Sequence, residues 1–327
     1  MEMLDTYLDP SGNYGRCDTP LRSDPQYNNE VFLSTPASPK ELKSLEKEYG
    51  HKFSTIYGAL LHISSASRPD ISNALNRLGV FQSGPNRLAF QSIFRILHYL
   101  KYHTNVPLMY SRHPFQTSTV FQSYHVTASN RNKLIVPHCL CGHVDSSFAP
   151  FKDDRHSITA CVETIGTTAV GWRVTKQLSC ATSATDAETR AYYVECKRIK
   201  HMRMFLQQIG LLLPKPSPIS TALSTNYTML SPIYEDNKGT RDMINANRVT
   251  TNLKHIELPL QYMHELHSNG VLMCLPCPSP MMFADPLTKK ETGPKHLQGR
   301  DWYKGKRFYP PPTSDHYKVL TSLAPLK

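Results

Sequence analysis

The sequence predicts an α/β protein in which a mixed five-stranded sheet flanked by helices follows a small helical segment and a partly disordered lead. Three observations support this fold class. Three β-branched, apolar runs follow one another after residue 132, a long amphipathic segment comes next, and two further apolar runs then alternate with helical patterns. Successive antiparallel strands followed by strand–helix alternation give a mixed sheet with helices on its faces.

The amino-terminal part of the chain divides into a lead and a helical segment. Residues 1–45 are rich in Pro, Ser, Asp and Asn and show little hydrophobic periodicity, so we expect an extended or disordered lead. A helical pattern starts near Ser38, which has the chemistry of a helix cap and is followed by a proline. Residues 46–104 continue this pattern and form the predicted helical segment.

Within the helical segment, the pattern indicates a helix that breaks at Arg68 and Pro69 and starts again near Asp70. A later stretch, "NRLAFQSIFRILHYLKYH", places apolar side chains on one stripe and basic or polar ones around it. Taken alone, these residues favour a packing module without chemistry of its own. A polar, Ser/Thr-rich linker is expected over residues 105–135.

The predicted α/β domain spans residues 136–292 and is followed by a tail over residues 293–327. Its first three strands lie in "KLIVPHCLCGHVDSSF", "SITACVETI" and "AVGWRV", and residues 184–210 form a long helix that stops at a glycine. The strand "SPIYED", the helical "NKGTRDMINA" and a helix with Pro259 in its first turn follow. The strand "VLMCLPC" and a short helix in "FADPLTKK" complete the domain.

The composition is basic, with 37 Lys and Arg residues against 26 Asp and Glu residues and a formal net charge of +11. This balance suits a surface that meets phosphate, although basic tails and solvated helix faces produce it as well. The sequence has no apolar run long enough to span a membrane and carries acids where a secretory signal needs basic residues. We therefore expect an intracellular protein of the cytoplasm or nucleus, not secreted and without a membrane partner, whose eight cysteines are reduced thiols.

Four acids fall at the ends of predicted elements: Asp145 in the first strand, Glu188 near the start of the long helix, Asp236 after the fourth strand and Asp285 at the start of the last helix. Carboxylates gathered at one edge of a sheet repel one another unless divalent cations neutralise them. Two Mg²⁺ ions held in this way can cleave a phosphodiester. Any one of these acids taken alone is better explained as a helix cap or a turn former.

A second metal hypothesis concerns two cysteine pairs. Cys139 with Cys141, and Cys274 with Cys277, have spacings found in zinc sites. Pro276 lies inside the second pair, and each pair flanks a predicted strand. Zinc is therefore the weaker interpretation.

The order of a series of motifs resembles the carboxy-terminal part of copia-type retrotransposon Pol polyproteins, over roughly residues 15–310. "YGALLHISSASRPDISNALNRLGVF" and "FRILHYLKYHTNVPLMY" are similar to the segment that connects the reverse transcriptase to its ribonuclease H. The stretch from "HVDSSF" to "DAETRAYY" is similar to the opening of that ribonuclease H, and "PIYEDNKGTRDMI", "LKHIELPLQYMHE" and "FADPLTKK" follow in the family's order. No Tyr-x-Asp-Asp occurs and position 237 is Asn, so the polymerase palm is absent from this sequence.

The resemblance implies a ribonuclease H-like sheet and an endonuclease that hydrolyses the RNA strand of RNA–DNA hybrids with two Mg²⁺ ions, for which Mn²⁺ can substitute. It makes Asp145, Glu188, Asp236 and Asp285 the catalytic and metal-binding carboxylates. His255 matches a recurrent histidine of the family to which we assign no role. The chain departs from many relatives at three positions that leave the four acids in place: Ser147, Phe148 and Asp186.

The expected partners are an RNA–DNA hybrid or other nucleic acid and a separate reverse transcriptase polymerase chain. Basic residues in and before the long helix are the candidates for phosphate contacts, although a solvated helix face explains them equally well: Lys176, Arg190, Lys197, Arg198, Lys200 and Arg203.

Three other functions fit parts of the sequence. They are a catalytically inactive nucleic-acid-binding remnant, an integrase or transposase, and a helical interaction module formed by residues 46–104. An integrase or transposase fits poorly, because the acids of such centres follow the order Asp, Asp, Glu, whereas Glu188 is second here.

Overall fold

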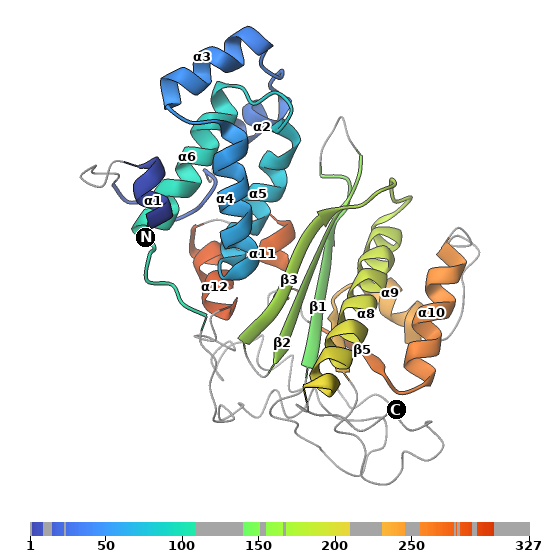
Figure 1. Ribbon diagram of the computed structural model, residues 1–327. Coiled ribbons are helices and arrows are strands. Elements are labelled where there is room, and N and C mark those ends of the chain that lie inside the picture. The colour runs from blue at the N-terminus through green and yellow to red at the C-terminus, as the bar shows by residue number, and fades with distance from the viewer. Residues whose placement is uncertain are drawn as a thin grey trace. The chain divides into compact units, whose positions relative to one another are not determined.

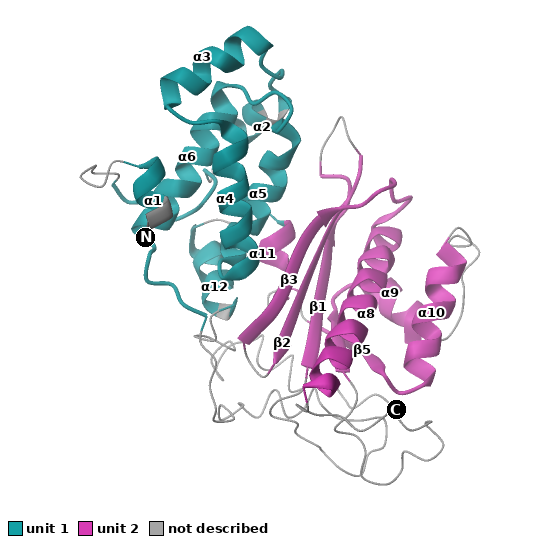
Figure 2. Cartoon of the chain, viewed as in Figure 1, with its two compact units in different colours: residues 1–108, 289–304 teal, residues 109–288, 305–327 magenta. Residues whose placement is uncertain are grey.

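The computed structural model describes residues 2–8, 15–22, 24–108, 140–150, 155–165, 168–209, 231–245, 256–277, 279, 282–289 and 293–303 (Figure 1). The chain forms two compact units (Figure 2). Unit 1 comprises residues 1–108 and 289–304, and unit 2 comprises residues 109–288 and 305–327. The linker expected over residues 105–135 is described only up to residue 108, and its remainder lies outside the described residues.

The described part of unit 1 is helical. Its elements are α1 (Glu2–Tyr7), α2 (Pro25–Leu33), α3 (Pro39–Tyr49), α4 (Phe53–Ala66), η1 (Pro69–Ile71), α5 (Ser72–Leu78), η2 (Gly79–Phe81), α6 (Arg87–Tyr102) and α12 (Gly293–Tyr303). Ser38 caps α3 by accepting a hydrogen bond from the Glu41 amide, and Gly50 ends that helix with a φ of 73°. The break expected at Arg68 and Pro69 is confirmed between α4 and η1.

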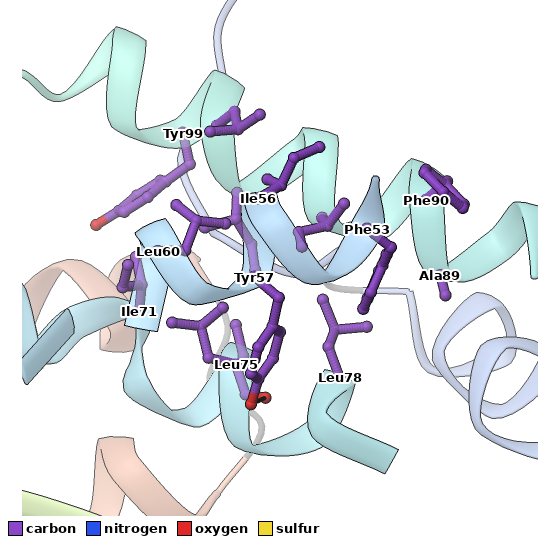
Figure 3. Close-up of a cluster of buried hydrophobic side chains, with 14 of the residues drawn as sticks. Phe53, Ile56, Tyr57, Leu60, Ile71, Leu75, Leu78, Ala89, Phe90 and Tyr99 are labelled. Atoms are coloured by element: carbon purple, nitrogen blue, oxygen red, sulfur yellow. Dashed lines mark hydrogen bonds between the residues drawn. The ribbon is translucent and has the colours of Figure 1, made fainter. Parts of the chain in front are cut away.

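The core of unit 1 lies between α4, α5 and α6 (Figure 3). Phe53, Ile56 and Leu60 recur at helical spacing on α4 and are at most 1 % exposed, which fixes the inner face of that helix. Phe90 of α6 packs edge-on against Phe53 at 5.5 Å between ring centroids. The Tyr57 hydroxyl donates to the Leu75 carbonyl at 3.1 Å and so ties α4 to α5.

Two parts of unit 1 differ from the sequence expectation. Helices α1 and α2 lie within the lead that was expected to be extended, and the Asp24 side chain caps α2 by accepting from the Gln26 amide at 2.9 Å. Helix α12 lies within the expected tail and belongs to unit 1. His296 of α12 shares a hydrogen bond of 3.0 Å with the hydroxyl of Tyr99 in α6, a contact between residues distant in sequence.

Unit 2 contains the five-stranded sheet, in the order β3-β2-β1-β4-β5. Strand β1 is antiparallel to β2, which is antiparallel to β3, whereas β1 is parallel to β4 and β4 to β5. The mixed sheet predicted from the sequence is confirmed. The described elements of unit 2 are β1 (Leu140–Ser147), β2 (Ile158–Ile165), β3 (Thr168–Lys176), α8 (Ala184–Gln208), β4 (Ser231–Glu235), α9 (Lys238–Asn245), α10 (Glu257–Ser268), β5 (Leu272–Pro276) and α11 (Asp285–Thr288).

One apolar core joins the sheet to α8, α9 and α10. Val144 of β1 and Ile233 of β4 point into it and meet Ala191 and Tyr192 of α8, all without exposed surface. Figure 1 shows α8 running along the sheet with α9 and α10 beside it. Successive residues of a strand point to opposite faces, so His143 and Asp145 lie on the other face of β1. His143 stacks there on Phe283, just before α11, at 4.6 Å between ring centroids.

Candidate metal centre

Three acids from separate elements meet in unit 2. Asp145 is in β1, Glu188 is in the first two turns of α8, and Asp236 directly follows β4. One carboxylate oxygen from each lies within 4.8 Å of those of the other two. Asp145 is 1 % exposed and Glu188 6 %, while Asp236 is partly exposed, so the group opens to solvent on the side of Asp236.

Strand register explains why two of these acids meet. His143 of β1 pairs with Tyr234 of β4 in parallel register. Asp145 and Asp236 each come two residues later and therefore reach the same height on neighbouring strands. Glu188 is added by α8, whose start is fixed by the Ser183 side chain, which accepts from the Asp186 amide at 3.1 Å.

The acids strongly affect one another. Burial raises the pKa of Glu188 well above its ordinary value of 4.5, and the carboxylates of Glu235, Asp145 and Asp236 raise it further. Its Oε2 atom is buried and has no hydrogen-bond partner among the described residues. A buried carboxylate oxygen beside two like charges is stabilised by a cation.

Glu235 is a fourth acid beside this group and was not singled out in the sequence. It is fully buried at the end of β4, and burial raises its pKa well above the ordinary value. Its Oε1 accepts a hydrogen bond of 2.9 Å from the Asn237 amide. The signal in the sequence was an acid inside an otherwise apolar strand, directly before Asp236.

Hydrogen bonds from three further residues hold the acids in place. Thr288 of α11 donates to Oδ2 of Asp145. Ser279 donates to Oδ2 of Asp236 at 2.7 Å. Arg241 of α9 donates to the backbone carbonyl oxygen of Asp236 at 2.6 Å and fixes the turn that follows β4. The contacts of Thr288 and Ser279 were not predicted, because they form only when segments 143 and 43 residues apart pack together.

The donor set fits a hard divalent cation such as Mg²⁺. Carboxylate oxygens are the ligands that Mg²⁺ and Mn²⁺ prefer, and Mg²⁺ usually binds through a few carboxylates together with water. Among the described residues, this is the one group of three or more acids, cysteines or histidines close enough to share an ion. A cation would also satisfy the buried oxygen of Glu188 that has no hydrogen-bond partner among the described residues.

Asp285, the fourth acid predicted from the sequence, is the first residue of α11 and is partly exposed. It does not belong to the group whose oxygens lie within 4.8 Å of one another. Burial raises the pKa of the Cys277 thiol, and the carboxylates of Asp236 and Asp285 raise it further. His255 lies outside the described residues.

The six predicted nucleic-acid contacts fall into two sets. Lys176, Lys197 and Lys200 are exposed. The three arginines bind groups of the protein itself. Arg190 pairs with Asp186 at 2.7 Å, Arg198 pairs with Glu163, and Arg203 is 4 % exposed and donates to Ser231 at 2.8 Å. The lysines are the more exposed members of the set, although the Nζ atoms of Lys197 and Lys200 lie 4.2 Å and 5.2 Å from the ring centroids of Tyr193 and Tyr262.

The cysteine pairs give no zinc group in the part of the chain that the structure describes, where the acids alone form a metal-type cluster. Cys139 lies outside the described residues. Cys141 and Cys274 are buried, Cys277 is partly buried, and none of the three is in a disulfide. His143, near the first pair, stacks between Tyr234 and Phe283, and burial lowers its pKa to about 3.

A mixed sheet of this order, with acids from β1, from the start of α8 and from the end of β4, defines an α/β protein of the ribonuclease H-like class. The chain is 25 % identical over 263 residues to a retrovirus-related Pol polyprotein from transposon RE1 of Arabidopsis thaliana, across 79 % of this chain and 15 % of that protein. It is 23 % identical over 246 residues to the corresponding polyprotein from transposon TNT 1-94 of Nicotiana tabacum, across 72 % of this chain and 15 % of that protein. The polyprotein from transposon RE2 of Arabidopsis thaliana is 24 % identical across 72 % of this chain and 14 % of its own length.

These similarities, at 23–25 % identity across 72–79 % of the chain, support its interpretation as a fragment of a copia-type retrotransposon Pol polyprotein. The chain spans about 15 % of the length of these Pol polyproteins. No protein-family model and no solved structure matches it. None of the helices in the described ranges is both long and apolar enough to cross a membrane.

Proposed function

We propose that unit 2 is a ribonuclease H-type endonuclease that hydrolyses the RNA strand of RNA–DNA hybrids. The observation that carries the proposal is the convergence of Asp145, Glu188 and Asp236, from three separate elements, with carboxylate oxygens within 4.8 Å. The relatives' description as Pol polyproteins of retrotransposons supports a nucleic-acid substrate. The resemblance to copia-type ribonuclease H supplies the reaction.

In this proposal Asp145, Glu188 and Asp236 hold two divalent cations, and Asp285 is a further ligand from α11. Bound Mg²⁺ or Mn²⁺ would supply Lewis-acid activation of a water and stabilisation of the leaving oxygen. The protein's own residues orient the site, since Thr288 and Ser279 hold carboxylate oxygens of Asp145 and Asp236. Cleavage of the P–O3′ bond leaves a 3′ hydroxyl and a 5′ phosphate.

Substrate recognition in this proposal depends on shape and charge. The 2′ hydroxyls and groove geometry distinguish an RNA strand from a DNA strand without contacts to base edges. Exposed Lys176, Lys197 and Lys200 supply phosphate contacts. The hybrid is the nucleic-acid partner, and a separate polymerase chain that makes it is the protein partner.

One observation favours the alternative, a nucleic-acid-binding protein without catalysis. Glu235 adds a further buried carboxyl beside Asp145 and Glu188 and raises the pKa of Glu188. A protonated Glu188 is a poor metal ligand, because a ligating carboxylate must lose its proton. For the nuclease to be active, metal binding must be strong enough to displace the proton from Glu188.

The deciding experiment is cleavage of a doubly labelled RNA–DNA hybrid by the purified chain in Mg²⁺, beside Asp145→Asn. Asp242→Asn, at an exposed position of α9, is the matched control for loss of one negative charge. We expect cleavage of the RNA strand alone by the wild type and by Asp242→Asn, and none by Asp145→Asn. A folded wild type that binds the hybrid and leaves it intact in both Mg²⁺ and Mn²⁺ selects the inactive alternative.

A further inference from the structure

Thr288 and Asp145 are joined by a hydrogen bond across 143 residues of sequence. Thr288 has no exposed surface and Asp145 is 1 % exposed, so water does not compete for this contact. The Thr288 Oγ1 atom also lies 3.2 Å from the carbonyl oxygen of Asp285. The hydroxyl therefore lies between the Asp145 carboxylate and the backbone of α11, the short helix that begins at Asp285.

The segment around α11 is fixed to β1 at two points. Phe283, before the helix, stacks on His143 at 4.6 Å between ring centroids. Thr288, at the end of the helix, contacts Asp145, two residues further along the same face of β1. A short helix has little stability of its own, so these contacts define where α11 lies.

Asp145 and Asp236 each accept a hydrogen bond from a side-chain hydroxyl. Thr288 donates to Oδ2 of Asp145, and Ser279 donates to Oδ2 of Asp236. A hydroxyl has a single proton to donate, so it engages one oxygen of the carboxylate and thereby sets the direction of the other. The Thr288 bond is buried at both ends, whereas Asp236 is partly exposed. Thr288 is therefore the donor whose removal water is least able to compensate.

We propose that Thr288 is a positioning residue that sets the orientation of the Asp145 carboxylate in the metal centre. The inference rests on the proposed function in one respect, namely that Asp145 ligates a cation. It gives the short helix α11 a second role in the centre, beside the acid at its start. Partners that orient ligating side chains typically change metal affinity about 10- to 100-fold when removed.

The first test needs no metal. The equilibrium constant for unfolding is measured by chemical denaturation for the wild type, Thr288→Val, Asp145→Ala and the double variant, in chelator. We expect the effect of Thr288→Val to be about tenfold larger when Asp145 is present, because the valine then removes a hydrogen-bond donor from a buried carboxyl group. Additive effects within about twofold would overturn the role of Thr288.

The second test is Mn²⁺ binding by titration calorimetry. Thr288→Val keeps the shape of the side chain without the hydroxyl, and Thr288→Ser keeps the hydroxyl. We expect affinity about 10-fold or more weaker for Thr288→Val and within about twofold of the wild type for Thr288→Ser. Equal affinities for the valine and serine variants contradict the proposal. A wild type that binds no Mn²⁺ removes the metal centre of the proposed function, and the metal-free cycle then decides the role of Thr288.

A matched control separates positioning from a general effect of removing a buried hydroxyl. Thr240 of α9 also has no exposed surface, and its Oγ1 lies 3.4 Å from the backbone carbonyl oxygen of Thr185 instead of an acid. We expect Thr240→Val to bind Mn²⁺ within about twofold of the wild type. An affinity for Thr240→Val as weak as that of Thr288→Val would refute a specific role for Thr288.

Discussion

Arg198 of α8 donates two hydrogen bonds to Glu163 of β2, of which the one from Nη2 to Oε2 is 2.8 Å long. Glu195, three residues before Arg198, is fully buried beside this pair, and neither of its oxygens has a hydrogen-bond partner among the described residues. Glycines make the necessary room, since a Cβ atom at Gly171 would lie 2.5 Å from Glu163 Oε2 and one at Gly142 would collide with Glu195. One guanidinium thus serves two interior carboxyl groups.

We therefore predict that Arg198→Met lowers the free energy of unfolding by about 3–5 kcal/mol, because it leaves buried acids without their cation. Lys197→Met, at the adjacent exposed position of the same helix, should change it by less than about 0.5 kcal/mol. Urea denaturation of both variants measures the difference. Similar losses in the two variants would show that the pair contributes little to stability.

The fold was predictable because its elements carry strong local patterns. Strand alternation, the long amphipathic run of α8 and the turn residues between strands gave the order of the sheet elements. Helix α12 was missed, because contacts such as His296 with Tyr99 and Arg300 with His103 depend on tertiary packing. The short α2 was missed because a proline- and asparagine-rich segment resembles a loop until its cap is seen.

The candidate site was predictable only in part, and α8 shows why. Glu188 was placed correctly near the start of the helix, whereas Arg198 and Arg203 were grouped with exposed lysines. Positions four residues apart on one helix share a face, and Arg203 follows the buried Ile199 at that spacing. The burial of Arg203 could therefore have been predicted from the sequence. The hydrogen bond from Thr288 to Asp145 could not have been predicted, because no local pattern links residues 143 positions apart.

Nucleic-acid binding should depend on the exposed lysines of unit 2. We predict that replacing Lys176, Lys197 and Lys200 by Ala flattens the salt dependence of hybrid binding, by up to about 0.9 in logarithmic slope for each phosphate that is no longer neutralised. The same number of substitutions at the exposed Lys40, Lys43 and Lys47 of α3 controls for net charge. Binding is measured by fluorescence anisotropy across a salt series. Identical slopes for the two triple variants would mean that net charge alone attracts the nucleic acid.

The metal-free protein should lose stability as pH rises. Burial raises the pKa of Glu195 well above its ordinary value of 4.5, and the neighbouring Glu163 raises it further. Above pH 4.5 the folded state then binds more protons than the unfolded state, so the free energy of unfolding falls as pH increases toward the raised pKa. Each such group contributes a slope of about 1.4 kcal/mol per pH unit within its window.

Glu195→Gln tests this effect, since it fixes the side chain in a neutral form. Between pH 5 and pH 8 we expect the free energy of unfolding to fall less in the variant than in the wild type. The difference is about 1.4 kcal/mol per pH unit over the range in which Glu195 is ionised in the unfolded state and still protonated in the folded state. Glu257→Gln, at an exposed position of α10, is the control and should follow the wild type. Denaturation at several pH values in chelator gives the slopes, and parallel curves for wild type and Glu195→Gln would assign the pH effect to other acids.

Unit 1 contains a buried polar chain whose central member is Tyr99. Its hydroxyl donates to Oδ2 of Asp70 at 2.6 Å and shares a hydrogen bond of 3.0 Å with His296. Tyr99→Phe removes the hydroxyl and leaves both partners short of a hydrogen bond, so we predict a loss of about 1–3 kcal/mol in the free energy of unfolding. Tyr102→Phe, at an exposed position of the same helix, should be close to neutral. Thermal or urea denaturation compares the two.

The four acids should differ in how much they contribute to catalysis. Asp145, Glu188 and Asp236 lie together, whereas Asp285 stands outside their group. We predict that Asp145→Asn, Glu188→Gln and Asp236→Asn each reduce hybrid cleavage by at least about 10³-fold, in line with the loss of a group that stabilises the transition state directly. Asp285→Asn should retain measurable activity and should be partly rescued by higher metal concentration, because a more distant ligand affects chiefly metal affinity. Single-turnover cleavage across a Mn²⁺ series separates affinity from rate. Loss of all activity in Asp285→Asn at saturating Mn²⁺ would mean that α11 closes on the centre when metal or substrate binds, and that the fourth acid then ranks with the other three.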